Sequence, residues 1–351
     1  MREMTSRERF MAALKGERVD RLPVVSICQH ATYEQMEQLQ CFWPEGLSDP
    51  KIMAKMASGA YSILGFDAIR VPFCQTTEAE AFGAVLKDGG REAMPSVLTH
   101  PYHVGDAIEF PEDFLSRGRI PALLEAIRIL KRNFGDKAVI IGGIIGPFSI
   151  ASLFFDVKEF LLSTFKKPEV LLPAIEVGEK AGTVLAQAMI EAGADAIAVE
   201  DMMASMDMIS PKIYRDLAWA AEKRQVAALS VPTIIHICGK LDSVLVDVAR
   251  TGCAALSVEH MVNVPAALEK FAAEGITTPL IGAIDPVGTL FSGDAEKVKQ
   301  DTRAAIAKGF AMISPGCAVP PATTTANLTA MVDTVKEVCA TTAAEAVERR
   351  R

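Results

Sequence analysis

PTIIHICGKL (residues 232–241) places a histidine and a cysteine at the end of a short apolar run, directly before a glycine. The β-branched residues of this run favour a buried strand. His236 and Cys238 are separated by one residue, and in extended backbone two such side chains point to the same face. The stretch therefore predicts a strand that ends in two donor atoms directed to one place.

This run is one of eight that alternate with segments of helical periodicity. Several of those segments end in glycine just before the next run, which is a common helix stop. Strand followed by helix, repeated eight times, predicts an α/β fold with a single closed parallel (β/α)8 TIM barrel. A doubly wound open sheet is the alternative, but no glycine-rich phosphate fingerprint follows the first run. The runs span residues 22–28, 67–73, 138–145, 195–200, 232–237, 254–259, 279–284 and 310–315.

The segments outside this repeat predict two additions to the barrel. Thr5 and Glu8 have the spacing of a capping box, so we expect an N-terminal helical extension before the first strand. The long interval 74–137 predicts an insertion after the second strand, lying over the barrel mouth. No linker or low-complexity stretch divides the chain, and residues 1–351 are expected to form one domain.

Composition narrows the class of protein. Half of the 351 residues are hydrophobic, and 36 basic against 44 acidic residues give a net charge of −8. No basic tract is present, which argues against nucleic acid and anionic membranes as partners. Seven cysteines without framework spacing argue against a secreted disulfide scaffold, and the N-terminus is too charged for a signal peptide. The chain is expected to be an acidic cytoplasmic protein.

The uncharged stretch 138–155 has the length at which a membrane helix is considered. Glycines and a proline interrupt its centre, at Gly142, Gly143, Gly146 and Pro147. We therefore expect a buried strand, a turn and the start of a helix.

The ends of the predicted strands carry metal-binding side chains. In a closed barrel these ends meet at one mouth, which brings Cys317, just beyond the eighth run, toward His236 and Cys238. One imidazole and two thiolates suit Zn²⁺, and three protein ligands leave a tetrahedral ion one open position, as in catalytic sites. Glu259, at the end of the sixth run, is expected to fill that position when substrate is absent.

This ligand set predicts thiol chemistry. Two thiolates and a neutral imidazole cancel the charge of the ion, so a bound substrate thiol can lose its proton near neutral pH and stay electron-rich. A harder ligand set would favour activation of water. Thiol alkylation is therefore the first expectation, and hydrolysis the second.

Other polar side chains near the predicted mouth are candidates for substrate binding. Arg70 lies inside the second run and can bind an acidic tail of the thiol, although a buried ion pair is an equal alternative. Cys28, Cys253 and Cys339 lie in apolar stretches and are expected to be structural. The remaining mouth candidates are Gln29, His30, Cys74 and Asp201.

The sequence resembles the methylcobalamin:coenzyme M methyltransferases of the uroporphyrinogen decarboxylase superfamily. The resemblance covers nearly the whole chain, and HICG (236–239) with the later PGC (315–317) is its most specific part. The segments that carry it are RFMAALKGERVDRLPV (9–24), VPFCQTTEAEAFG (71–83), GGIIGPFSIAS (142–152), HICGK (236–240), LSVE (256–259) and SPGC (314–317).

This resemblance implies a TIM barrel with zinc held by His236, Cys238 and Cys317, and with Glu259 as a displaceable fourth ligand. It also implies an activity in methanogenesis and one-carbon metabolism. A methyl group would pass from a methylated corrinoid (cobalamin), carried on a separate small protein, to the zinc-bound thiolate of coenzyme M. None of the five histidines lies in an Asp-x-His-x-x-Gly motif, so the chain is expected to use a partner's corrinoid.

Two other classes of function stay open. One is a uroporphyrinogen decarboxylase-like enzyme, or a corrinoid methyltransferase with another thiol or tetrahydrofolate as acceptor. SICQHATYEQM (26–36), which follows the first strand, lacks the arginines that a decarboxylase uses to hold its four-carboxylate substrate. The other is a non-catalytic corrinoid-docking or metal-binding protein.

Overall fold

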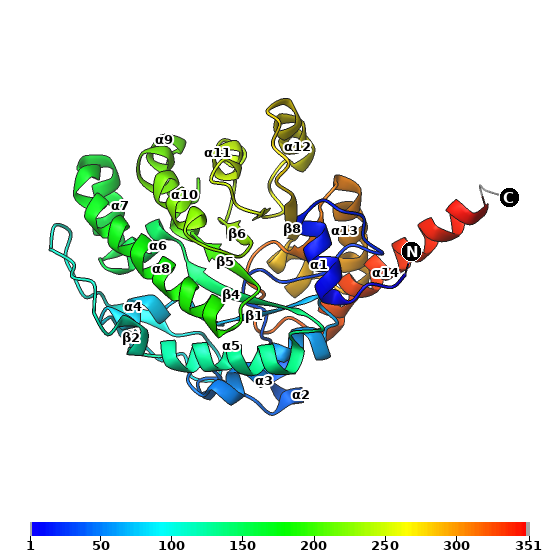
Figure 1. The fold of residues 1–351 in the computed structure, drawn as a ribbon, viewed down its shortest axis with the longest axis horizontal. Helices are drawn as coiled ribbons and strands as arrows, with labels where there is room; N and C mark the ends of the chain where they lie inside the picture. Colours follow the sequence, from blue (N-terminus) through cyan, green and yellow to red (C-terminus); the bar gives the residue numbers. More distant parts are fainter. Residues whose placement is uncertain (1, 349–351) are drawn as a thin grey trace.

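The structure, a computed structural model, describes the backbone of residues 2–348 and the side chains of residues 2–341. Parallel strands pair in chain order into one curled sheet with helices outside it (Figure 1). This is the predicted barrel architecture. The strands are β1 (Ala68–Val71), β4 (Val139–Ile145), β5 (Ala196–Glu200), β6 (Thr233–His236), β7 (Ala255–Ser257), β8 (Leu280–Ile284) and β9 (Met312–Pro315).

The segment predicted as the first strand, 22–28, closes the ring without forming a regular strand. The amide of Val25 donates to the carbonyl of Ile313 at 2.9 Å, and the amide of Ile313 donates to Pro23 at the same distance. On the other side, the amide of Asp67 donates to Val24 at 2.7 Å. Pro23 has no amide hydrogen to donate, and the amide of Val24 donates to the carboxylate of Asp67 at 2.8 Å, so this segment forms a bridge and not a regular strand.

Helices cover the outside of the ring and connect its strands. Most of them follow the predicted periodic segments. The longer helices are α3 (Pro50–Ser62), α5 (Ile120–Phe134), α7 (Val157–Lys166), α8 (Leu172–Ala192), α10 (Trp219–Ala227), α12 (Val264–Ala273), α13 (Ala295–Lys308) and α14 (Thr325–Glu348). The shorter helices are α2 (Tyr33–Leu39), α4 (Thr77–Ala81), α6 (Pro147–Leu153), α9 (Pro211–Ile213) and α11 (Leu245–Ala249), with π-helical turns η5 (Tyr214–Ala218) and η6 (Pro286–Phe291).

The N-terminal helix α1 (Ser6–Leu14) plugs one end of the barrel. Thr5 and Glu8 form the predicted capping box at its start. Phe10 is fully buried and belongs to the same apolar cluster as the inward-facing strand residues, Ile141 and Ile234 among them. Since the metal-binding candidates lie at the carboxyl ends of the strands, this helix closes the opposite end.

The barrel interior changes from apolar to polar along the strands. Residues two positions apart on a strand face the same side, so the residue two places after each apolar interior residue also points inward. Ala68, Ala198, Ile234 and Ala255 belong to the interior apolar cluster. The residues that follow them by two are Arg70, Glu200, His236 and Ser257, all buried.

The predicted insertion is shorter than expected. It holds α4 and an antiparallel hairpin of β2 (Val85–Lys87) and β3 (Ser96–Thr99). It ends before α5, which packs on β4 as a barrel helix. His100 Nδ1 lies 2.9 Å from the carbonyl of Leu153, at the end of the helix that follows β4. The excursion is therefore attached on the side where β4 ends, which is the mouth side.

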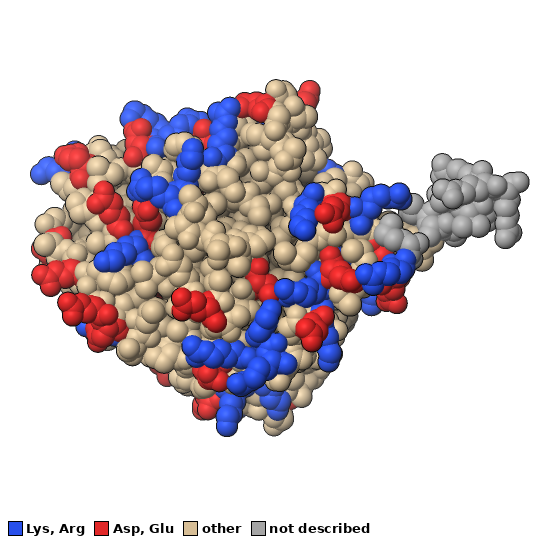
Figure 2. Space-filling model, viewed as in Figure 1, with Lys and Arg blue, Asp and Glu red and all other residues tan. Residues whose placement is uncertain are grey.

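The uncharged stretch 138–155 folds as predicted. Strand β4 is followed by Gly146 and then by helix α6, and both elements are buried. Within residues 2–348, no helix has both the length and the apolar character needed to cross a bilayer. On the face seen in Figure 2, acidic and basic side chains are interspersed around a central area with few charges.

Candidate active site

Three side chains predicted to bind metal converge at the barrel mouth. Cys238 Sγ lies 3.5 Å from His236 Nε2 and 3.6 Å from Cys317 Sγ. Glu259 offers a carboxylate oxygen within 4.8 Å of both sulfurs. Cys238, Glu259 and Cys317 are partly exposed, whereas His236 is buried, so the cluster is open on one side.

These distances fit a tetrahedral zinc ion. Bonds of about 2.3 Å to sulfur and 2.0–2.1 Å to nitrogen place two ligand sulfurs about 3.8 Å apart, and a sulfur and a nitrogen about 3.6 Å apart. The sulfur–sulfur and sulfur–nitrogen separations in the cluster agree with these edges. The donor set also matches the softness of zinc. The residues present therefore fit the metal.

Gly239 forms the turn that presents Cys238. Its φ of +76° lies in the left-handed region, and a Cβ there would stand 1.9 Å from a carboxylate oxygen of Asp207. The amide of Gly239 donates to Glu259 Oε1 at 2.9 Å, which joins the loops after β6 and β7. The glycine of the HICG motif is thus required by backbone conformation and by space.

The pKa values of the Cys238 and Cys317 thiols are shifted in opposite directions. Hydrogen bonding to Cys238 is the largest cause that lowers the pKa of Cys317, with contributions from Cys28 and His236. The same interaction with Cys317 raises the pKa of Cys238. Two adjacent thiolates repel each other, so a cation beside the cluster favours the state in which both cysteines are deprotonated.

A residue on the neighbouring strand orients the imidazole of His236. Its Nδ1 lies 3.1 Å from the hydroxyl of Ser257 on the neighbouring strand, which leaves Nε2 toward the sulfurs. Burial lowers the pKa of His236, but Cys317 and the carboxylates of Glu200 and Glu259 outweigh burial and raise it. The ring is thus held in an anionic surrounding that also favours a metal cation.

The structure pairs Arg70 with Glu200 inside the barrel, so the alternative of a buried ion pair is the correct one. Gln75 donates to the other carboxylate oxygen of Glu200 at 2.5 Å. Gly143 makes room for this guanidinium, because a Cβ there would lie 2.3 Å from Arg70 Nη2. The prediction that Arg70 binds an acidic substrate tail has no support in this arrangement.

Asp201 caps helix α6 instead of lining the mouth. Its fully buried carboxylate accepts from the amides of Phe148 and Ser149, at 3.2 and 2.7 Å, and from the Ser149 hydroxyl at 2.6 Å. The N-cap residue of helix α6 is Gly146, which has no side chain to cap the helix. Asp201 therefore satisfies amides that the local sequence leaves free.

The remaining candidates are placed at strand ends. Cys74 is buried, with Arg119 Nη1 3.1 Å from its sulfur. Gln29 is half-buried, and its carbonyl accepts from the amide of Val319 at 2.9 Å. His30 is buried edge-on against Phe73, and burial together with the positive charge of Arg70 lowers its pKa to about 4. His30 is therefore a neutral buried histidine.

Cys28 belongs to the cluster, contrary to the expectation that it is structural. Its sulfur lies within 4.8 Å of a ring nitrogen of His236 and of Cys317 Sγ. Only 3% of the residue is exposed. Its position at the end of the first run was the available signal, but its apolar neighbours favoured a structural interpretation.

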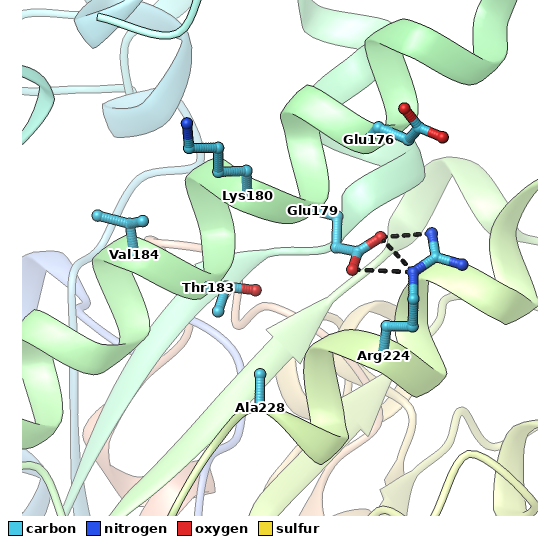
Figure 3. Close-up of a pocket in the computed structure, with 7 residues that line it drawn as sticks. All are labelled: Glu176, Glu179, Lys180, Thr183, Val184, Arg224 and Ala228. Atoms are coloured by element: carbon cyan, nitrogen blue, oxygen red, sulfur yellow. Dashed lines mark hydrogen bonds and ion pairs between the residues drawn. The ribbon is translucent and has the colours of Figure 1, made fainter. Parts of the chain in front are cut away.

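A groove of about 330 Å³ on the molecular surface is separate from this cluster. Its lining residues come from α8, α10 and the residue after α10. Figure 3 shows the carboxylate of Glu179 turned toward the guanidinium of Arg224, and the two are paired. The cluster of His236, Cys238 and Cys317, and not this groove, is the candidate active site.

Comparison with known proteins agrees with the fold. The profile of the family described as uroporphyrinogen decarboxylase (URO-D) matches residues 5–338. The chain belongs to this family and, within it, to the group of methylcobamide:CoM methyltransferases.

Relatives in that group match over nearly their full length. The methylcobamide:CoM methyltransferase MtaA of Methanosarcina barkeri is 37% identical, over 95% of this chain and 98% of its own. MtbA of Methanosarcina acetivorans, of the same description, is 35% identical, over 96% and 99%. A solved structure of a methyltransferase from Methanosarcina mazei superposes with a TM-score of 0.91 at 35% identity, covering 96% of this chain and 99% of that one.

Proposed function

We propose that this protein transfers a methyl group from a methylated cobamide, carried on a separate small corrinoid protein, to the thiol of coenzyme M. The observation that carries the proposal is the cluster of His236, Cys238 and Cys317, whose distances match the edges of a zinc tetrahedron. The names of relatives over 35% identical, which act on methylcobamide and CoM, supply the donor and the acceptor.

Within this proposal, His236, Cys238 and Cys317 hold Zn²⁺, and Glu259 lies within reach on the open side. A bound zinc ion lowers the pKa of a thiol that reaches it, so that the thiol is a nucleophile near neutral pH. Ser257 keeps the His236 ring in place, and the amide of Gly239 keeps the Glu259 carboxylate in place. These contacts pre-organise the site before substrate arrives.

The chemical step is a direct displacement. The acceptor thiolate attacks the methyl carbon, the sulfur–carbon bond forms, and the cobalt–carbon bond breaks with both electrons left on cobalt as Co(I). The thiol proton leaves toward solvent on the side where Cys238 and Cys317 are partly exposed. The protein contributes by aligning the two reactants and by excluding water from the buried side.

The test is demethylation of free methylcobalamin with coenzyme M, homocysteine or tetrahydrofolate supplied in parallel. We expect turnover with coenzyme M, less with homocysteine and none with tetrahydrofolate. Turnover that does not need a thiol would overturn the mechanism. Turnover with tetrahydrofolate alone would assign another acceptor.

Replacement of Cys238 by serine tests the role of the cluster. We expect Cys238→Ser to lose bound zinc and at least about 100-fold in methyl transfer, because a thiolate ligand is lost. Cys253→Ser is the matched control, since its sulfur lies in another apolar region, 3.8 Å from the carbonyl of Val248. Equal activity of Cys238→Ser and wild type would refute the proposed ligand set.

A further inference from the structure

We infer that Lys240 binds the sulfonate of coenzyme M and thereby makes the enzyme select an acceptor thiol with an anionic tail. This inference rests on the proposed function, because it assumes that the acceptor thiol reaches a metal held by the cluster at the barrel mouth. It assigns to Lys240 the tail-binding role that Arg70 does not have, since Arg70 is paired with Glu200.

Lys240 lies beside the cluster of His236, Cys238 and Cys317. It follows Cys238 by two residues, so the two Cα atoms are at most about 7 Å apart. The residues before and after it, Gly239 and Leu241, are buried, whereas Lys240 is exposed and Cys238 is partly exposed. The side chain of Lys240 therefore extends to solvent next to a partly exposed sulfur of the cluster.

The backbone on both sides of Lys240 is held in place. The amide of Gly239 donates to Glu259 Oε1 at 2.9 Å, and the amide of Asn263 donates to a carboxylate oxygen of Asp242 at 3.0 Å. Both bonds attach the loop after β6 to the loop after β7. The base of the lysine side chain is thus fixed relative to the cluster. Its flexible stem of four methylene groups lets the ammonium reach a sulfonate that is two carbons from the thiol.

Negative groups otherwise surround the place where the thiol would bind. Glu259 offers a carboxylate oxygen within 4.8 Å of the sulfurs of Cys238 and Cys317, and the carboxylate of Asp207 lies close to Gly239. A sulfonate is ionised at neutral pH, so these carboxylates and the cysteine thiolates repel it. An acceptor with this tail therefore needs a cation next to the cluster.

Lys240 is such a cation, and its ammonium is available. Among the side chains that the structure describes, none forms a hydrogen bond or an ion pair with it. Three other basic side chains near the carboxyl ends of the strands already contact a carboxylate. They are Arg70 with Glu200, Arg119 with Glu80, and His260 with Asp285. Lys240 differs from them because an anionic substrate does not have to displace an acidic partner.

Three thiols that differ only in their tail test this inference, with free methylcobalamin as the methyl donor. Coenzyme M carries a sulfonate, 2-mercaptoethanol a neutral hydroxyl and cysteamine an ammonium, and we expect the wild type to prefer them in this order. Lys240→Gln should lower kcat/KM for coenzyme M about tenfold or more, mainly through KM, because a charge-assisted hydrogen bond is lost. Lys240→Glu should reverse the order, and Lys240→Arg should keep it.

Calorimetric titration with coenzyme M measures the same contact without turnover. We expect Kd to be about tenfold or more higher for Lys240→Gln than for wild type, at unchanged zinc content. Lys270→Gln is the matched control and should bind coenzyme M as wild type does. Lys270 is also exposed, but it lies in the last turn of α12, before β8 starts at the opposite end of the barrel.

The outcomes separate this inference from the proposed function. The inference is overturned if wild type and Lys240→Glu show the same order of thiols, or if Lys240→Gln loses equally with all three. A wild type that does not prefer coenzyme M to 2-mercaptoethanol overturns it as well. If the wild type demethylates methylcobalamin with none of the three thiols, the proposed function itself is wrong.

Discussion

At the scale of single residues, Ser257 decides which nitrogen of His236 faces the sulfurs. Its hydroxyl pairs with Nδ1 at 3.1 Å from the adjacent strand. A second partner of this kind fixes ring orientation and tunes the basicity of a metal-binding histidine. Serine suits this position because its side chain is small enough for the barrel interior and still supplies a polar atom.

We predict that Ser257→Ala weakens zinc binding about tenfold or more, because His236 loses its orienting partner. The measurement is competition for zinc with a chromophoric chelator. Ser314→Ala is the matched control, since Ser314 is also buried in a barrel strand but its hydroxyl donates to the carbonyl of Pro315. An equal effect in both variants, or none in either, would contradict a positioning role.

At the scale of elements, helix α1 is attached to the barrel floor by charge as well as by apolar packing. Arg9 of α1 donates to both carboxylate oxygens of Asp20, at 2.6 and 2.8 Å. The amides of Met4 and Arg21 donate to the same carboxylate, each at 2.9 Å. Burial raises the pKa of Asp20, but these hydrogen bonds outweigh burial and lower the pKa to about 2.

This shift predicts a pH dependence of stability. Because the pKa of Asp20 is lower in the folded than in the unfolded chain, its contribution is complete above about pH 4 and is lost as the pH falls toward 2. Asp20→Asn should therefore lower the free energy of unfolding by about 1–2 kcal/mol at neutral pH, with the difference from wild type vanishing near pH 2.

Denaturant unfolding at a series of pH values measures this difference. Glu296→Gln serves as a control, because Glu296 is exposed and its ion pair with Lys299 lies at the surface. A difference between Asp20→Asn and wild type that is constant down to about pH 2 would exclude the proposed linkage.

At the scale of the whole molecule, Asp67 closes the ring of strands. Its fully buried carboxylate accepts from Arg9 at 2.7 Å, from Arg21 at 2.8 Å and from the amide of Val24 at 2.8 Å. The segment of Val24 lies between β9 and β1, so this one carboxylate joins the helical plug to the point of closure. By accepting the amide of Val24, the carboxylate replaces a backbone acceptor in the segment 22–28, which forms a bridge and not a strand.

Asp67→Ala should lower the free energy of unfolding by about 3–5 kcal/mol, because it leaves a buried amide and two arginine side chains without their shared partner. Asp216→Ala removes an exposed partner of Lys212 and should cost less than about 1 kcal/mol. Urea unfolding monitored by circular dichroism compares the two. A small, equal cost for both variants would mean that the ring closes without Asp67.

The fold was predictable because alternation of strand and helix is a local property. The eight apolar runs coincide with the seven strands and the bridged segment 22–28, and the capping box formed as expected. The predicted length of the insertion was wrong. The helical periodicity of α5 is the same whether the helix belongs to the insertion or to the barrel, so the sequence pattern does not distinguish the two. The predicted first strand is reduced to a bridge, where Pro23 has no amide hydrogen to donate and the amide of Val24 pairs with the Asp67 side chain.

The sequence by itself determined the barrel and the pair His236 and Cys238, since period-two geometry places residues two apart on one face. Only the tertiary structure decided that Cys28 joins the cluster, that Arg70 pairs with Glu200 and that Asp201 caps α6. Those contacts link residues between 52 and more than 200 positions apart, and their partners depend on how strand ends meet around a closed ring. Local patterns carry no information about such pairings, because burial and hydrogen bonding are settled only when distant segments pack together.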